Sequence, residues 1–332
     1  PLPKFMEIAA EFAVSIVTVI KALDALEARG LIDRHCGKGI FVKPPNPGGP
    51  RTHAIGVVVP DVANPFFASM SKALQKHLHE HGYQVICQGT EGSLALRNQH
   101  LRRFIDDGVD GIVIVPADSD KPEREQVLWQ LKLSRIPFVY LNTAFKRVPS
   151  DHVVVDLERA VSLAADHLLE LGHRHIGCIS AQPFRKETRF KAEVLRRRLA
   201  VAGVELREDE VRVGASKHDE GGHEAALELL DRPRRPTALF ATNDIIAPGA
   251  IHAARELGIS VPGDLSIIGL DNIEFGRLSV PRLSTVGHPV EEMATRAAGI
   301  LLQRIAGQLD PEFVEEVVEP ELVVRDSTRA PG

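Results

Sequence analysis

The sequence is poor in cysteine, with three in 332 residues, and Cys36, Cys87 and Cys178 lie far apart. This spacing argues against a disulfide framework and for reduced thiols, which are typical of the cytosol. No apolar run approaches the roughly 18 residues of a membrane span. The N-terminus also lacks the basic start and apolar stretch of a secretory signal. We expect a cytoplasmic protein with no membrane segment and, because the sequence begins at Pro1, further residues upstream.

The sequence also lacks the motifs of common enzyme classes. It contains no G-x-G-x-x-G, G-x-x-x-x-G-K-[ST], G-x-S-x-G or H-E-x-x-H pattern. His77 and His81 are spaced to share a zinc ion, but a polar helix end before Gly82 explains them equally well, because cations are favourable there. We therefore predict no catalytic residues, no cofactor and no metal site.

Length and charge limit the remaining classes. A chain of 332 residues is long enough for two or three domains. The net charge of −5 excludes binding to a polyanion through overall charge, so a nucleic-acid site has to be local. The clearest domain boundary is "KPPNPGGPRT", whose prolines and glycines predict a linker at 44–52. It separates a small domain at 1–43 from a large one at 53–332.

The large domain alternates short apolar runs with amphipathic helices, which predicts α/β folding with parallel sheets covered on both faces. The helices end at glycines, as C-terminal caps require: Gly82, Gly108, Gly172 and Gly258. The predicted strands are Ile55–Val59, Val85–Cys87, Gly111–Val115, Phe138–Leu141, His152–Val155, Ile176–Ile179, Ala238–Ala241 and Leu265–Leu270. Ligands of such sheets bind beyond the carboxyl ends of the strands, so polar residues that follow strands become candidates.

Six phrases follow one another between Ala54 and Thr328: "IGVVVPDVANPFF", "GVDGIVIVP", "IPFVYLN", "VVVDLERAVSLAADHLLELGHRHIGCIS", "PTALFATNDIIAPGAIHAARELGISVPGDLSIIGLDN" and "PRLSTV". The series resembles the effector-binding core of LacI/GalR-type bacterial regulators, which shares its fold with periplasmic sugar-binding proteins. The resemblance implies two lobes with an effector between them and three chain crossings, near 141–143, 286–288 and 306–310. Lobe one would comprise 53–143 and 287–306, and lobe two 144–285 and 310–328.

The resemblance also implies a set of pocket residues. Phe66 and Phe67 in "NPFF" match positions that stack on the effector, although they equally suit packing of the first helix on the sheet. Asn243, Asp271 and Asn142 follow strands and carry side chains that bind hydroxyl groups. Asn and Asp at such places also cap helices, so both interpretations stay open.

Cations of the second lobe raise the question of an acidic effector. The family has an arginine clamp in a helix that here reads "TRFKAEVLRRRLAVAG"; matching the motif selects Arg189, and counting back from Gly203 selects Lys191. Lys217 stands where relatives have an aromatic residue, and solvation at the surface explains it as well. If these cations face the pocket, a sugar acid becomes a candidate effector, because such groups pair with carboxylates.

The small domain reads "LPKFMEIAAEFAVSIVTVIKALDALEARGLIDRHCGKGIFVK". Ser15 suits an N-cap for a helix that runs to Arg29, with Val19, Leu23 and Leu26 on its packing face. Two short strands around a glycine turn follow. The whole resembles the winged helix-turn-helix of GntR-type regulators, without the helix that precedes "LP" in that family.

The start of the second helix is the segment that such motifs insert into the major groove. Apolar side chains replace the usual arginines, and contacts to thymine methyl groups are the chemistry that they permit. Positive charge moves to the wing instead. The predicted DNA-binding residues are Ser15, Ile16, Val17, Thr18, Ile20, Lys21, Arg34 and Lys38.

The sequence as a whole predicts a ligand-responsive DNA-binding transcriptional regulator, a repressor that binds operator DNA as a homodimer and releases it in response to a sugar or sugar derivative. Two alternatives remain. One is a degenerate head that no longer binds DNA. The other is a solute-binding receptor of the periplasmic type, which shares the two-lobed fold but has no DNA function.

Overall fold

The computed structural model describes residues 2–3, 5–12, 14–28, 32–35, 39–42, 51–116, 126–143, 148–182, 186–309 and 312–332. The chain divides into two compact units, a small one that contains Pro1–Thr52 and a large one that begins at His53, and each is considered by itself. Most of the predicted linker, together with Gly30, Cys36 and Lys38, lies outside the described residues. Among the described helices, none combines the length and the apolar character that a membrane span requires.

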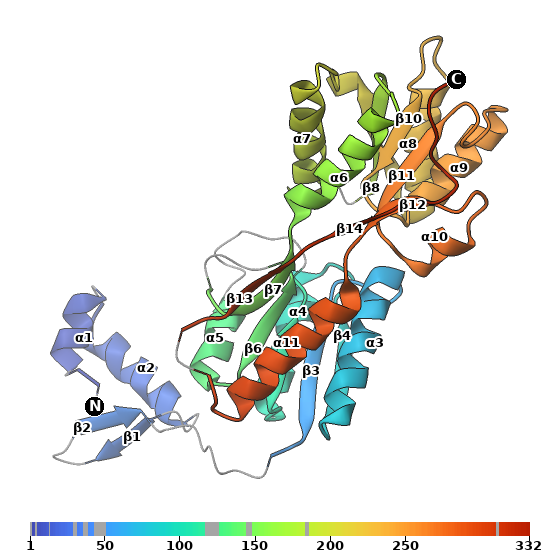
Figure 1. Cartoon of the computed structure of the whole chain (residues 1–332). Coiled ribbons are helices and arrows are strands. Elements are labelled where there is room, and N and C mark those ends of the chain that lie inside the picture. Colours follow the sequence, from blue (N-terminus) through green and yellow to red (C-terminus); the bar gives the residue numbers. More distant parts are fainter. Residues whose placement is uncertain are drawn as a thin grey trace. The chain divides into compact units, whose positions relative to one another are not determined.

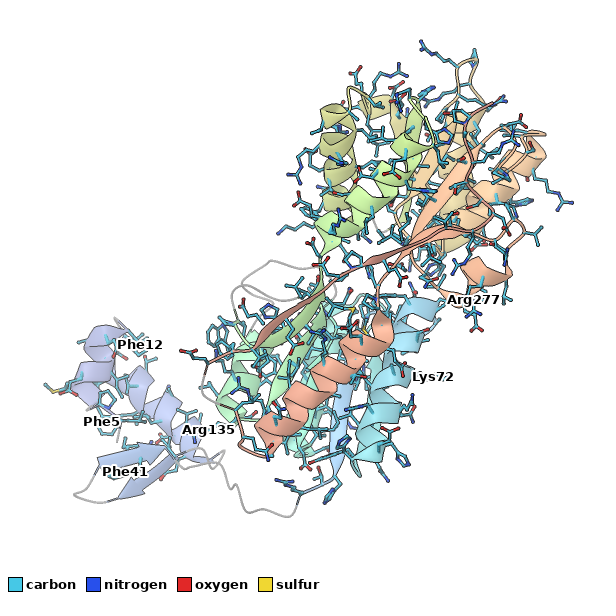
Figure 2. All side chains as sticks on the ribbon, in the orientation of Figure 1. Phe5, Phe12, Phe41, Lys72, Arg135 and Arg277 are labelled. Carbon is cyan, nitrogen blue, oxygen red and sulfur yellow. The ribbon has the colours of Figure 1, made fainter. Side chains whose placement is uncertain are left out.

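The small unit contains two helices followed by a hairpin: α1 (Phe5–Glu11), α2 (Ile16–Ala28), β1 (Ile32–His35) and β2 (Gly39–Val42). The two strands pair antiparallel and form the predicted wing. A small apolar core joins these elements through the buried side chains of Ala9, Val19, Leu23 and Ile32. Phe5 and Phe12, at either end of α1, are exposed (Figure 2).

The large unit has the two-lobed α/β architecture that the sequence predicts, with one six-stranded sheet in each lobe (Figure 1). The first sheet has the order β13-β7-β6-β5-β3-β4, and every neighbouring pair is parallel. Its strands are β3 (Ala54–Val59), β4 (Gln84–Gly89), β5 (Gly111–Ile114), β6 (Phe138–Asn142), β7 (Asp151–Val155) and β13 (Glu315–Val318).

Helices cover both faces of the first sheet, as a parallel sheet requires. One face packs on α3 (Pro65–Glu80) and α11 (Val290–Ile305), which supply Met70, Leu74 and Met293 to its core. The opposite face packs on α4 (Leu94–Asp106) and α5 (Gln126–Ser134). Figure 1 shows α3 and α11 side by side along this lobe.

The second sheet has the order β14-β12-β11-β10-β8-β9, in which only the edge strand β14 is antiparallel to its neighbour. Its strands are β8 (Ile176–Gln182), β9 (Val211–Lys217), β10 (Ala238–Ala241), β11 (Ser266–Asp271), β12 (Ser284–Gly287) and β14 (Glu321–Val323). One face packs on α6 (Leu157–Glu170) and α7 (Lys186–Val201), the other on α8 (His218–Leu230) and α9 (Ala247–Glu256). The short helix α10 (Glu274–Leu278) follows β11.

The glycines that were predicted to end helices adopt the left-handed conformation that such caps use. The φ angles are +81° at Gly82, +65° at Gly108, +97° at Gly172 and +68° at Gly258. These stops set where each following strand enters its sheet, and they therefore place the polar residues at the strand ends.

Two of the three chain crossings lie elsewhere than expected. Residues 151–155 form β7 beside β6 in the first sheet, so the chain leaves lobe one after Val155 and not near 141–143. Residues 315–318 pair with β7 as β13, so the last crossing falls between Val318 and Glu321, not at 306–310. An apolar strand pattern does not show which of two sheets the strand joins, and this is why the boundaries moved. The second crossing follows Gly287, within the expected range.

Candidate functional site

A cavity of about 450 Å³ opens at the carboxyl ends of strands from both lobes. Asp61 follows β3, Glu91 follows β4 and Asn142 ends β6. Lobe two contributes Asn243 after β10 and Asp271 at the end of β11. This is the edge at which open α/β sheets bind ligands, and we call the cavity the effector cleft.

Most of the predicted pocket residues line this cleft, and one does not. The structure brings together Phe66, Phe67, Asn142, Lys191, Lys217, Asn243 and Asp271. Arg189 is exposed on α7 and is not among the lining residues. On a helix, positions four apart share a face, so Glu187 and Lys191 both reach the cleft while Arg189 points elsewhere.

The aromatic wall of the cleft is also part of the protein core. The Phe66 ring is buried and lies edge-on to Phe67, with centroids 5.3 Å apart. It makes a second edge-on contact with the imidazole of His288, at 5.4 Å. Phe66 therefore packs α3 on the sheet and lines the cleft at once, so the two interpretations of this residue are compatible.

Buried polar atoms without hydrogen-bond partners gather in the cleft. Within the described part of the chain, Asn142 Oδ1, Asn243 Oδ1 and both ring nitrogens of His288 make no hydrogen bond, and His288 Nδ1 comes no closer than 3.9 Å to Asp271 Oδ1. A buried polar group that makes no hydrogen bond costs about 1–3 kcal/mol, and native proteins rarely tolerate several. Their concentration in one cavity is the expected property of a site that a polar ligand completes.

Backbone strain gathers at the same strand ends. Glu91, Asn142, His218 and Asp271 line the cleft and have φ angles of +49°, +72°, +53° and +118°. Side chains other than glycine rarely adopt this left-handed region, and such residues are found at functional sites more often than elsewhere. The strained backbone turns these side chains toward the cavity, because an extended residue would continue the strand.

Lys191 is the buried cation of the cleft. Its Nζ lies 2.9 Å from Glu187 Oε1 and donates a hydrogen bond to the carbonyl oxygen of Thr242 at 3.2 Å. Burial alone lowers the pKa of Lys191, but the carboxylates of Glu187, Asp271 and Asp244 outweigh that effect and raise it. Lys191 is thus a charged group whose nearest partner is already a carboxylate of the protein.

Asp271 and Asp244 have different positions, although both follow strands. Burial raises the pKa of Asp271 well above the usual range of a carboxyl, against the opposing charge of Lys191. Asp244 does not line the cleft: it accepts hydrogen bonds from the Thr285 hydroxyl at 2.7 Å and from the backbone N–H of Ile273 at 3.0 Å. Burial raises its pKa to about 6. Asp244 therefore ties three segments of lobe two together behind the site.

Sequence reasoning missed several lining residues. His288 follows β12, and its pKa falls to about 3, through burial first and through the charge of Lys191 second, so the ring is neutral. Glu187 stands four residues before Lys191, a spacing that would have identified it once the register was known. Asp61 and Glu91 follow strands β3 and β4, and the strand-end rule would have included both.

The small unit presents a different surface at the start of α2. Ile16, Val17 and Ile20 are 46%, 60% and 38% exposed, although they are large apolar residues. Ser15 caps the helix: its hydroxyl accepts a hydrogen bond from the backbone N–H of Thr18 at 3.1 Å and lies 2.8 Å from the Thr18 hydroxyl. The two hydroxyls thus have partners within the helix.

The predicted basic residues of the head differ in their surroundings. Lys21 is exposed on α2. Arg34 on β1 forms ion pairs with Asp24 at 2.6 Å and with Glu27 at 3.2 Å, so it holds the wing to α2. Lys38 lies outside the described residues.

Comparison with known proteins agrees with both parts of the chain. The profile of the bacterial regulatory proteins of the gntR family matches residues 1–42, and that of the periplasmic binding protein-like domain matches residues 165–328. The arabinose metabolism transcriptional repressor of Geobacillus stearothermophilus is 30% identical over 333 aligned positions, which cover 99% of this chain and 91% of that protein. The HTH-type transcriptional regulator DegA of Bacillus subtilis (strain 168) is 34% identical, covering 84% of this chain and 82% of that protein.

A solved structure shows the same fold with a bound sugar. The LacI family transcriptional regulator from Enterococcus faecium with bound ribose superimposes with a TM-score of 0.73 and 29% sequence identity, covering 84% of this chain and 100% of that chain. The proteins matched over most of their length are regulators of transcription. This chain belongs to the LacI-type transcriptional regulators and carries a DNA-binding head of the GntR family.

Proposed function

We propose that the protein is a transcriptional repressor whose binding to operator DNA is controlled by a neutral sugar or sugar derivative in the effector cleft. The unpaired buried atoms of Asn142, Asn243 and His288 carry this proposal. The amide oxygens accept hydrogen bonds, and a neutral imidazole offers one donor and one acceptor. Sugar hydroxyl groups match this mixture because each both donates and accepts.

The charges of the cleft favour a neutral effector over a sugar acid. Its carboxylates outnumber its amines, and Lys191 is already paired with Glu187. A carboxylate ligand would have to compete with that ion pair and approach further acids. The acidic lining residues are Asp61, Glu91, Glu187 and Asp271, and the amines are Lys191 and Lys217. Lys217 is exposed, so it offers an acid weak attraction at best.

Two of the similar proteins, whose names include sugars, support this ligand class. One relative is a repressor of arabinose metabolism, and one structural neighbour holds ribose. We infer a pentose or a similar small sugar, which a cavity of about 450 Å³ accommodates.

We infer that the head reads operator DNA through the start of α2, as a homodimer on a two-fold site. Ile16, Val17 and Ile20 supply the exposed apolar surface that thymine methyl groups fit. Lys21 is placed to contact phosphate. Arg34 has a mainly structural role in this proposal, because two carboxylates already engage it. Dimerisation doubles the contacts, which a head with few cations needs.

A solute-binding receptor is the alternative function. This function accounts for the two lobes but not for the DNA-binding head. The match of residues 1–42 to a family of regulatory proteins favours the repressor.

The experiment has two stages. Thermal unfolding and calorimetric titration are measured with L-arabinose, D-ribose, D-xylose and D-galactose, and in parallel with D-glucuronate and ribose 5-phosphate. We expect one neutral sugar to raise the unfolding temperature, because it binds the folded state alone. Tight binding of D-glucuronate or ribose 5-phosphate, without binding of any neutral sugar, would contradict the proposal of a neutral effector.

The second stage selects operator DNA from a random duplex pool with the immobilised protein. Fluorescence anisotropy then measures affinity with and without the sugar, and sedimentation gives the stoichiometry. A two-fold symmetric site, bound by two chains and released by the sugar, is the expected result. Failure to enrich any sequence would favour the receptor function.

A further inference from the structure

Helices α8 and α9 bring three metal-ligating side chains together, away from the effector cleft. His223 Nε2 lies 2.9 Å from Glu256 Oε2, and His252 Nε2 lies 3.5 Å from Glu256 Oε1. The ligand atoms all lie within 4.8 Å of one another. Within the described part of the chain, no other set of three or more His, Cys, Asp or Glu side chains meets that distance.

The site is built on rigid elements, and glycines set its geometry. A β-carbon at Gly222 of α8 would lie 2.1 Å from the carbonyl oxygen of Ile246, and one at Gly249 of α9 would lie 1.9 Å from that of Asp219. Only glycine permits so close an approach of the two helices. His223 follows Gly222 directly and His252 is three residues beyond Gly249, so the close approach brings the two imidazoles together, with ring centroids 5.1 Å apart.

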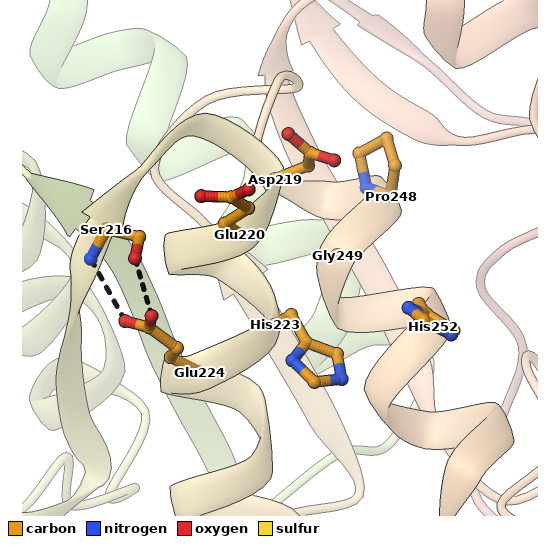
Figure 3. A pocket seen from close by; sticks show the side chains of 8 residues that line it. All are labelled: Ser216, Asp219, Glu220, His223, Glu224, Pro248, Gly249 and His252. Atoms are coloured by element: carbon orange, nitrogen blue, oxygen red, sulfur yellow. Dashed lines mark hydrogen bonds between the residues drawn. The ribbon is translucent and has the colours of Figure 1, made fainter.

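A hollow of about 390 Å³ lies beside the cluster and includes both histidines in its wall (Figure 3). It leaves room for a solvent ligand on the ion. The carboxylates of Asp219 and Glu220 also line the hollow and add negative charge near the ligands. Glu224 is occupied elsewhere: it accepts hydrogen bonds from the Ser216 hydroxyl at 2.6 Å and from the backbone N–H of Ala215 at 2.6 Å.

We propose that His223, His252 and Glu256 bind a divalent transition-metal ion, with Zn²⁺ as the best fit and water as the fourth ligand. Two imidazoles and one carboxylate select zinc, cobalt or nickel over magnesium and calcium, which prefer oxygen ligands. In a tetrahedral zinc site, ligand atoms lie about 3.3 Å apart, as Zn–N bonds of about 2.0–2.1 Å require. The ligand atoms lie within 4.8 Å of one another, so the side chains have to close by up to about 1.5 Å to reach that value.

The ion would clamp α8 to α9 on one face of the second sheet. His252 and Glu256 are four residues apart on α9, and His223 comes from the other helix, so binding joins the two elements. None of the three ligands lines the effector cleft.

The test uses the full-length chain, stripped of metal with a chelator, and ZnCl₂ as the titrant in calorimetry. We expect one Zn²⁺ per chain. His252→Gln and His223→Gln should each weaken binding by about tenfold or more, since loss of a ligand costs at least as much as loss of a group that orients it. CoCl₂ should give the visible absorption of a four-coordinate ion in the wild type, and the band should vanish in His252→Gln.

His81→Gln is the matched control. His77 and His81 are also four residues apart, with tilted rings 4.9 Å apart between centroids, but they have no third ligand among the described residues. Zinc should raise the unfolding temperature of the wild type and of His81→Gln, but not that of His252→Gln. The proposal fails if the wild type binds no zinc at ten equivalents, or if His252→Gln and His223→Gln bind it as tightly as the wild type.

Discussion

The effector cleft and the start of α2 both violate the usual distribution of side chains, in opposite directions. In the cleft, polar atoms of Asn142, Asn243 and His288 are buried without partners. On α2, the apolar side chains of Ile16 and Val17 are exposed, whereas the neighbouring hydroxyls of Ser15 and Thr18 pair with each other. Folding alone favours neither arrangement, because buried polar groups need partners and large apolar groups favour burial.

The difference indicates the kind of ligand that each surface serves. Unpaired buried polar atoms gain most from a ligand covered with hydroxyl groups. Exposed apolar side chains gain most from a surface that presents methyl groups, such as thymine in the major groove. The function of such a residue can therefore be tested by substitution. A residue that serves a ligand should affect the affinity of the complex, whereas a structural residue should affect the stability of the free protein.

The largest effect should come from the cation of the cleft, which is a structural and not a spare group. Lys191→Met removes the ion-pair partner of Glu187 and the donor to the Thr242 carbonyl oxygen, so we expect a loss of about 3–5 kcal/mol in the free energy of unfolding by urea. Lys217→Met, in the same cleft but exposed, should change it by less than about 0.5 kcal/mol. If the two substitutions changed the free energy of unfolding equally, the ion pair of Lys191 with Glu187 would contribute nothing to stability.

Asn243 and Asn64 separate a binding role from a stability role. Asn243→Ala removes an unpaired amide oxygen, so the free protein should be as stable as before while sugar affinity in calorimetry falls about 10- to 100-fold. Asn64 also lines the cleft, but its Oδ1 already accepts a hydrogen bond from Phe66 N at 3.0 Å as the cap of α3. Asn64→Ala should cost about 1 kcal/mol of stability. The comparison breaks down if Asn243→Ala destabilises the free protein more than Asn64→Ala does.

The neutral His288 should make the protein sensitive to acid. Its pKa is about 3 when folded and 6.5 when unfolded, so below pH 6.5 the unfolded chain binds a proton that the folded chain does not. Its contribution is complete above pH 6.5 and is lost as the pH falls toward 3. Between pH 7 and pH 5, the wild type should lose about 2 kcal/mol more of its free energy of unfolding than His288→Gln.

Asp244 changes the free energy of unfolding with pH in the opposite direction, but its contribution cancels when the wild type and His288→Gln are compared. Its pKa rises from 3.8 to about 6 on folding, so its contribution is present below pH 3.8 and is lost as the pH rises through 6. Both proteins contain Asp244, so it cancels in the difference. Parallel pH profiles for the wild type and His288→Gln would show that the imidazole titrates normally.

The smallest effect should come from the exposed face of α2. Val17→Ser should leave stability within about 0.5 kcal/mol and weaken operator binding by about 1 kcal/mol, close to fivefold, through the loss of methyl contacts. Val19→Ser, two residues further along α2, removes a buried side chain from the small core. It should therefore unfold the head rather than remove a single contact with DNA. Anisotropy measures the first variant and circular dichroism the second. If Val17→Ser bound the operator as tightly as the wild type, Val17 would have no role in DNA recognition.

Much of the fold and part of the cleft were predictable because both depend on local patterns. Apolar runs identified the central strands, and left-handed glycines marked the helix ends. Asn142, Asn243 and Asp271 stood out because each is a polar residue at or just after the end of an apolar strand. The sequence did not show which face of α7 points toward the cleft, because this depends on the packing of the whole helix. That packing places Lys191, and not Arg189, in the cleft.

Other parts depend on long-range contacts that no local pattern records. The strand before His288 reads "STVG", and the hydroxyl of its buried Ser284 accepts a hydrogen bond from the backbone N–H of the distant Arg325 at 2.9 Å. The assignment of β7 and β13 to the first sheet depends on their pairing with each other although the paired residues, such as His152 and Glu315, are 163 positions apart in the sequence. His223 and Glu256 likewise meet only through helix packing.

The three links between the lobes are short enough to determine how the lobes move. Asp156 alone separates β7 from α6, His288 and Pro289 separate β12 from α11, and Glu319 and Pro320 separate β13 from β14. Two residues span about 7 Å at most, and each proline fixes one of the few torsions available. Three such hinges side by side resist sliding and stretching of one lobe past the other. They leave rocking as the soft motion, so ligand closure in the cleft becomes a rotation of whole lobes.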